Sequence, residues 1–103
     1  MDISDVKLNI WYKEIRYPEY FFLFKGKEYS NNNELLDCYF IGLYEGLRSV
    51  IISETAMEFG QQGKVGYNIN TGRATRIDNL REKKHFGRRL IREIFEKQLG
   101  RLL

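Results

Sequence analysis

The stretch VIISETAMEFGQQGKVGYNINTGRATRI, residues 50–77, decides which fold class the sequence predicts. Residues 50–59 are rich in branched apolar side chains, which predicts a strand, and residues 60–63 form a flexible connection. Residues 64–70 and 73–77 then flank Thr71-Gly72, which suits a tight hairpin turn because glycine accepts a positive φ angle. We therefore expect an antiparallel sheet at the centre of the domain.

The N-terminal part of the chain predicts a second hairpin. Apolar and polar residues alternate from Val6 to Lys13, which is the period of a half-buried strand. Residues 17–19, with the only proline, interrupt this pattern, and the aromatic run at residues 20–24 predicts another strand that ends at Gly26-Lys27. Two strands from this part would join the sheet.

Residues 34–48 allow two interpretations. Possible capping residues precede four apolar residues at helical spacing, which favours a helix: Leu36, Phe40, Leu43 and Leu47. The alternative is a strand at residues 37–44 with a turn at Glu45-Gly46, because Gly42 and Gly46 would each cost a helix about 1 kcal/mol. We favour the helix and keep the strand open.

The C-terminal part predicts a long amphipathic helix. Asn79 and Glu82 resemble a capping box, and a helix to about Leu102 would place six apolar residues on one face: Leu90, Ile91, Ile94, Phe95, Leu99 and Leu102. The predicted fold is therefore α+β, an antiparallel sheet of four or five strands packed by one or two helices. We expect residues 1–103 to form a single domain ending in a basic amphipathic C-terminal helix.

Composition indicates a cytoplasmic protein. The chain has 103 residues with 43% hydrophobic content, so it can bury a core without metal or disulfide. Cys38 is its only cysteine, which fits a reducing cytoplasm. We expect no membrane association, because no basic leader precedes an apolar run and no stretch approaches the roughly 18 apolar residues of a membrane span.

Charge is divided unevenly along the chain. Residues 73–103 carry ten Lys and Arg against four Asp and Glu, whereas residues 1–72 carry seven against ten. The second half of the predicted helix pairs its charges four residues apart, as with Arg89–Glu93 and Arg92–Glu96, whereas its first half holds like-charge neighbours. The candidate partner-binding residues are therefore Arg73, Arg76, Arg81, Lys83, Lys84, His85, Arg88, Arg89 and Arg92.

Two classes of partner fit such a basic surface. Clustered arginines suit phosphates, because guanidinium stays charged and donates two parallel hydrogen bonds, so nucleic acid is slightly preferred. The predicted order of helix, three antiparallel strands and basic terminal helix resembles that of double-stranded RNA-binding domains, although Lys83-Lys84 is followed by His85 and Phe86 instead of the small residues typical of that family. The alternative is a small inhibitor or immunity-type protein that blocks an acidic protein partner.

Fifteen aromatic residues allow a second contact surface. If one sheet face were open, Trp11, Tyr20 and Phe22 would form a platform for bases, a protein partner or a second subunit, so a homodimer through this face is possible. Burial of the aromatic residues in the core is the simpler interpretation.

The sequence does not favour an enzyme. Cys38 and His85 are the only residues of their types, and a lone thiol is usually inert packing, so a Cys/His dyad is disfavoured. One cysteine and one histidine cannot form a common zinc site. We expect no catalytic residues, no metal site and no cofactor.

Overall fold

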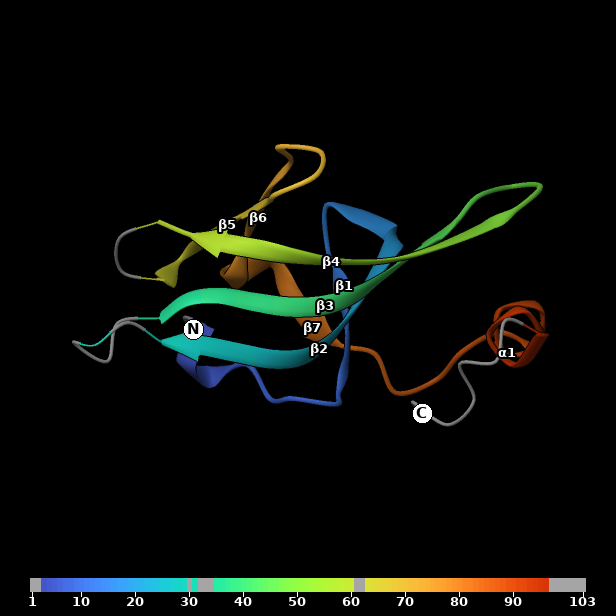
Figure 1. Cartoon of the computed structure of the whole chain (residues 1–103). Helices are drawn as coiled ribbons and strands as arrows, with labels where there is room; N and C mark the ends of the chain where they lie inside the picture. The colour runs from blue at the N-terminus through green and yellow to red at the C-terminus, as the bar shows by residue number, and fades with distance from the viewer. Residues whose placement is uncertain (1–2, 30, 32–34, 61–62, 97–103) are drawn as a thin grey trace.

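The computed structural model describes residues 3–29, 31, 35–60 and 63–96. Its main feature is one antiparallel sheet whose strands follow the order β6-β5-β4-β3-β2-β1-β7 (Figure 1). The strands are β1 (Trp11–Glu14), β2 (Tyr17–Tyr29), β3 (Leu35–Glu45), β4 (Val50–Phe59), β5 (Val65–Asn68), β6 (Ala74–Arg76) and β7 (Leu80–Glu82). Short 3₁₀ turns η1 (Ile3–Asp5) and η3 (Ile77–Asn79) and one helix, α1 (Arg88–Glu96), complete the described elements.

The sheet curls into a half-barrel. Its edge strands β6 and β7 are consecutive in sequence, and η3 links them across the open side. The linkage is held by backbone hydrogen bonds from Ile77 N to Lys64 O (2.9 Å) and from Ile15 N to Asn79 O (2.8 Å). Register shifts in β1 and β2 mark irregularities of the β-bulge kind, which bend strands and increase twist.

Both faces of the sheet are buried at its centre. In β2, the four consecutive residues Phe21–Phe24 are all buried, with Phe22 and Phe24 in one apolar cluster and Phe21 and Leu23 in the other, on the opposite face. The inner cluster fills the curl of the sheet: Ile3, Val6, Tyr12, Phe22, Phe24, Cys38, Phe40, Met57, Phe59, Ile77 and Leu80. The outer cluster is formed between the sheet and α1, which contributes its last two members: Trp11, Phe21, Leu23, Ile41, Leu43, Val50, Leu90 and Ile94.

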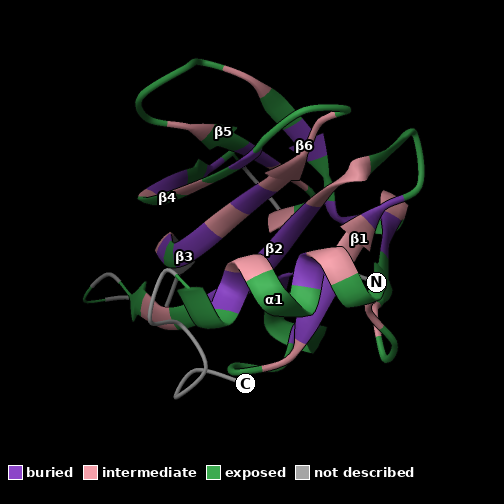
Figure 2. Cartoon of the chain, turned by 90° about the vertical axis from the view of Figure 1, so that its right-hand side faces the viewer, coloured by how far each residue is buried: buried purple, intermediate pink, exposed green. Residues whose placement is uncertain are grey.

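Helix α1 covers only one end of the outer face (Figures 1 and 2). Leu90 and Ile94 are its buried residues, one turn apart on the side that meets the sheet. Ahead of the helix, the Phe86 ring packs edge-on against Trp11 and Phe21, with ring centroids 5.7 and 6.0 Å apart. The helix is therefore attached by one apolar stripe and by the segment that precedes it.

The predicted fold class is wrong in its numbers of strands and helices. Seven strands replace the expected four or five, and among the described residues a single α-helix covers the sheet. Two strands were not expected: β3 replaces the helix predicted at residues 34–48, and β7 occupies the predicted start of the terminal helix. The fold is a curled antiparallel sheet with one helix on its outer face.

The helix expected at residues 34–48 is the largest error. The structure has β3 there, paired with β2 on one side and β4 on the other, so the alternative interpretation as a strand was correct. Phe40 belongs to the inner cluster and Leu43 to the outer one, while Leu47 is 99% exposed in the following turn. Apolar residues on both faces of a buried strand produced the apparent helical spacing.

The terminal helix is shorter at its start than expected. It begins at Arg88, because residues 80–82 pair with β1 and Asn79 ends η3 instead of capping a helix. Within the predicted apolar face, Ile91 and Phe95 are exposed, and Leu99 and Leu102 lie outside the described residues. The order of elements is consequently not that of a double-stranded RNA-binding domain.

Other predictions from the sequence are confirmed. β4 has the predicted bounds, β1 and β2 form the N-terminal hairpin, and β5 and β6 form a hairpin around Gly72, whose φ is 71°. The strand expected from Val6 is shorter, because regular pairing starts at Trp11, and Pro18 lies inside the start of β2 without breaking it.

Candidate functional site

The basic segment, residues 81–92, crosses three kinds of structure. Arg81 lies on β7, Lys83, Lys84 and His85 lie in the irregular connection, and Arg88, Arg89 and Arg92 lie on α1. The helix predicted to open at Asn79 would have carried the whole segment, so this placement is wrong for the residues from Arg81 to His85, which precede α1. The segment nevertheless stays continuous along the chain and leads to the end of the molecule where α1 lies (Figure 1).

Part of this charge is engaged within the fold. The Arg81 guanidinium donates hydrogen bonds to the carbonyl oxygens of Asp78 and Leu80. The Arg89 guanidinium reaches the Leu47 carbonyl oxygen at 3.2 Å, and Lys83 Nζ lies 5.9 Å from the Phe21 ring centroid. These three side chains therefore hold the segment against the sheet.

The remaining charges of the segment face solvent. Lys84, His85, Arg88 and Arg92 are exposed. Arg92 forms the expected pair with Glu96, with 3.9 Å between Nε and Oε1, whereas Lys84 and Arg88 take part in none of the ion pairs among the described residues. Lys84 and Arg88 are thus the cations of the segment that are most available to a partner.

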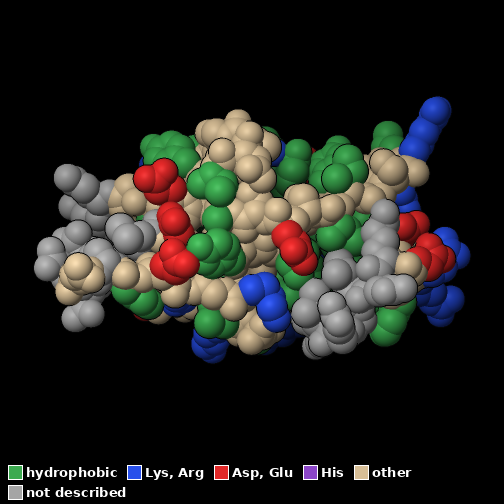
Figure 3. All heavy atoms as spheres, in the orientation of Figure 1, with side chains coloured by type: hydrophobic (Ala, Val, Ile, Leu, Met, Phe, Trp, Pro, Cys, Tyr) green, Lys and Arg blue, Asp and Glu red, His purple; other side chains and the backbone are tan. Residues whose placement is uncertain are grey.

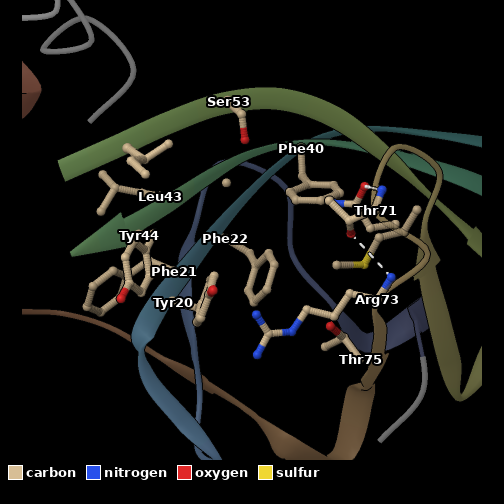
Figure 4. A pocket seen from close by; sticks show the side chains of 14 residues that line it. Tyr20, Phe21, Phe22, Phe40, Leu43, Tyr44, Ser53, Thr71, Arg73 and Thr75 are labelled. Atoms are coloured by element: carbon tan, nitrogen blue, oxygen red, sulfur yellow. Dashed lines mark hydrogen bonds between the residues drawn. The ribbon is translucent and has the colours of Figure 1, made fainter. Parts of the chain in front are cut away.

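Arg73 and Arg76, which were grouped with this segment, separate in the structure. Strand alternation places Thr75 inward and leaves Arg76 exposed. Arg73, immediately before β6, lines a cavity of about 450 Å³ between the β5–β6 turn and strands β2, β3 and β4 (Figure 4). Arg73 therefore belongs to a different site from the basic segment.

The cavity combines apolar walls with hydroxyl groups. Among the described residues, no Asp, Glu, Lys or His lines it, so Arg73 is the only charged residue of this lining. Its lining is Tyr20, Phe21, Phe22, Phe40, Gly42, Leu43, Tyr44, Ile51, Ser53, Met57, Asn68, Thr71, Arg73 and Thr75. The apolar base of the cavity is continuous with the inner cluster, since Phe22, Phe40 and Met57 belong to both.

Aromatic rings position the Arg73 guanidinium. Its Cζ lies 4.1 Å from the Tyr20 ring centroid and 4.3 Å from that of Tyr17, distances at which a cation is attracted to the ring face. Tyr20 in turn packs against Tyr44, with centroids 4.7 Å apart. None of the ion pairs among the described residues involves Arg73. Neighbouring Arg16, by contrast, pairs with buried Glu14 at 3.2 Å.

The turn that carries Arg73 is internally hydrogen-bonded. Asn68 Oδ1 accepts hydrogen bonds from the backbone N–H groups of Asn70 (2.9 Å) and Thr71 (3.1 Å), and Thr71 Oγ1 accepts one from Arg73 N (3.2 Å). Asn70 Nδ2 also donates to Thr55 Oγ1 on β4 at 2.8 Å. The turn therefore holds Arg73 at the cavity in a defined position.

The predicted aromatic platform does not exist as one surface. Tyr20 and Phe22 line the cavity, whereas Trp11 is buried on the opposite face of the sheet under Phe86. Sequence reasoning missed the other contributors to the cavity, above all Tyr44, Ser53 and Thr75. If residues 34–48 had been interpreted as a strand, the alternation of side chains in β3 and β4 would have placed Tyr44 and Ser53 on the same face as Phe40.

The structure places Cys38 and His85, the two residues considered for a dyad, in different surroundings. Cys38 is fully buried, and burial raises the pKa of its thiol to about 11, so it stays protonated near neutral pH. His85 is exposed in the connection to α1, whereas Cys38 belongs to the inner cluster. The described part of the chain brings together no group of three or more His, Cys, Asp or Glu that could hold a metal ion.

A search of the described helices for membrane spans found none that is long and apolar enough. No family model, curated protein or solved structure matches the chain.

Proposed function

We propose that this chain is a non-catalytic binding module for an anionic macromolecule, with nucleic acid preferred. The observation that carries the proposal is the basic segment, which holds six Lys and Arg and a single acid, Glu82. Lys84 and Arg88 are exposed and outside the ion pairs of the described residues. Such cations are available to a partner without loss of an internal ion pair.

The start of α1 adds to the positive potential of the segment. A helix N-terminus carries about half a positive charge, and cations nearby cost some 0.3 to 1 kcal/mol each. The first turn of α1 contains no acid to offset this, although Arg88 and Arg89 lie in it. An anionic partner would stabilise this arrangement, because its charge would meet both the helix terminus and the side chains.

Nucleic acid fits the chemistry of these side chains. Guanidinium donates paired hydrogen bonds to phosphate oxygens, and neutralised phosphates release counterions that favour binding. An acidic protein is the second candidate, favoured by one observation: Ile91 and Phe95 are 39% and 60% exposed on α1 beside the basic residues. Aromatic side chains such as Phe95 are enriched at protein interfaces, so an inhibitor role remains the alternative proposal.

The test compares two variants of equal charge. Lys84→Gln with Arg88→Gln removes two cations of the segment that form no ion pair with the described residues, whereas Lys25→Gln with Lys64→Gln removes two exposed cations outside the segment, on β2 and immediately before β5. Fluorescence anisotropy with labelled DNA and RNA, duplex and single-stranded, measures affinity. We expect the first variant to bind about tenfold more weakly or worse and the second to retain most of its affinity.

Equal weakening by both variants would show that only total charge matters and that the segment is not the contact surface. If the wild-type protein binds neither DNA nor RNA at micromolar concentration, nucleic acid is the wrong partner. Binding to an acidic protein that Phe95→Ala weakens would then support the inhibitor alternative.

A further inference from the structure

We propose that the cavity beside Arg73 is a binding site for a small organic carboxylate with a flat apolar body. This site is separate from the basic segment and does not depend on the function proposed above. Its volume, about 450 Å³, lies within the range of about 300 to 1,000 Å³ typical of ligand pockets.

The charge of the cavity selects the charge of the ligand. Within the described part of the chain, Arg73 is the only charged residue of the lining, and it forms no ion pair. A guanidinium donates two parallel hydrogen bonds to a carboxylate, which matches one positive with one negative charge. A phosphate monoester carries up to two negative charges and would leave part of its charge unmatched in this cavity.

The walls select the body of the ligand. Figure 4 shows the Arg73 guanidinium between the Tyr20 and Phe22 side chains on one side and Thr75 on the other. The rings of Phe22 and Phe40, 5.4 Å apart, and the Met57 side chain form apolar walls. These apolar side chains form no hydrogen bonds with water, so an apolar ligand body that displaces water from them would bind favourably. A flat ring suits the site in particular, because it can stack on the aromatic side chains.

Hydroxyl groups in the lining of the cavity add hydrogen-bonding groups to the site. Ser53, Thr71 and Thr75 line the cavity with Tyr20 and Tyr44, and each hydroxyl can donate one hydrogen bond to a carboxylate oxygen. Thr75 is only 3% exposed, so its side chain is held in place by packing. The site is preorganised, because the hydrogen-bonded turn at residues 68–73 and the two tyrosine rings already position Arg73.

The test uses three naphthalene probes and purified full-length protein. Isothermal titration calorimetry compares 2-naphthoate, its neutral amide 2-naphthamide, and 2-naphthyl phosphate. We expect 2-naphthoate to bind and 2-naphthamide to bind about tenfold to a hundredfold more weakly, the range for hydrogen bonds to a charged group. Tighter binding of the phosphate than of the carboxylate would overturn the assignment of ligand class.

Two pairs of variants locate the site. Arg73→Gln should weaken 2-naphthoate binding about tenfold or more, while Arg76→Gln, three residues away and exposed, should leave it unchanged. Ser53→Trp should block the cavity, while Glu54→Trp, on the opposite face of β4, should not. Proton NMR spectra of each variant confirm that the fold is retained.

Unchanged affinity in folded Arg73→Gln and Ser53→Trp variants would contradict the proposal, as would the absence of 2-naphthoate binding at about 1 mM. Failure here leaves the basic segment untouched, since Lys84 and Arg88 do not line the cavity.

Discussion

At the scale of single residues, position in a strand decides what each arginine can do. Arg73 and Arg76 are three residues apart and look equivalent in the sequence, yet Arg73 lies on two tyrosine rings at a cavity and Arg76 is exposed. The sequence predicted that this stretch is basic but not that Arg73 and Arg76 lie in different surroundings. The division depends on which face of β6 each side chain occupies, and this is known only once the strand is placed.

Close packing at Gly66 gives a prediction for a single residue. A Cβ atom on Gly66 would lie 2.8 Å from Phe59 Cε1 and 3.0 Å from Met57 Sδ, both in the inner cluster. We expect Gly66→Ala to lower the free energy of unfolding by about 1 to 3 kcal/mol, because overpacking forces its neighbours to move. Urea denaturation measures the change.

Gly60 provides the matched control, since a Cβ there meets no atom within 4 Å. Gly60→Ala should change stability by less than about 0.5 kcal/mol. Equal effects of the two substitutions would show that the packing around Gly66 is looser than described.

The Cys38 thiol predicts a loss of stability at high pH. Burial raises its pKa from 9.0 to about 11 in the folded protein. The protonated thiol contributes fully to the free energy of unfolding below pH 9, and this contribution is lost as the pH rises toward 11. The reason is that the thiol ionises at a lower pH in the unfolded state than in the folded state, so high pH favours unfolding. We expect the Cys38→Ala variant to lose less stability across this interval than the wild type. Parallel pH profiles in the two proteins, measured by urea denaturation, would contradict this.

At the scale of elements, strands buried on both faces limited the prediction. Strands β4, β5 and β6 and their turn were recognised because branched residues and a glycine turn are local signals. β3 was mistaken for a helix because the inner and outer clusters bury both of its faces at its centre, which removes the alternating pattern. The start of α1 was misplaced because Leu80–Glu82 pairs with β1, a contact between distant parts of the chain.

Helix α1 offers a sharp test of its packing. Ile94 is fully buried against the sheet, whereas the adjacent Phe95 is 60% exposed. We expect Ile94→Asp to cost several kcal/mol, comparable to the stability of the whole domain, because a charge would enter an apolar contact. Phe95→Asp should leave the melting temperature nearly unchanged. Circular dichroism melts compare the two, and a stable, cooperative Ile94→Asp variant would show that the domain does not require the helix.

At the scale of the whole molecule, the charge division in the sequence is only partly a division in space. Figure 3 shows Lys and Arg side chains at the end where α1 lies, but acidic side chains lie there too, and others lie over the sheet. The basic part of the chain also contributes β6 and β7 to the sheet, so its described cations do not gather in one place. The composition predicted a basic C-terminal part, but the placement of Arg73 in a cavity of its own required the curled sheet.

Salt dependence of nucleic acid binding tests the central proposal most directly. If the basic segment neutralises about five phosphates, affinity for a DNA or RNA duplex should fall by roughly two to three orders of magnitude between about 50 and 200 mM salt. The Lys84→Gln, Arg88→Gln variant should show a slope of log affinity against log salt that is smaller by about two. Anisotropy titrations at a series of salt concentrations give both slopes. An affinity that hardly changes with salt, or a slope that is the same in both proteins, would contradict binding of phosphates by this segment.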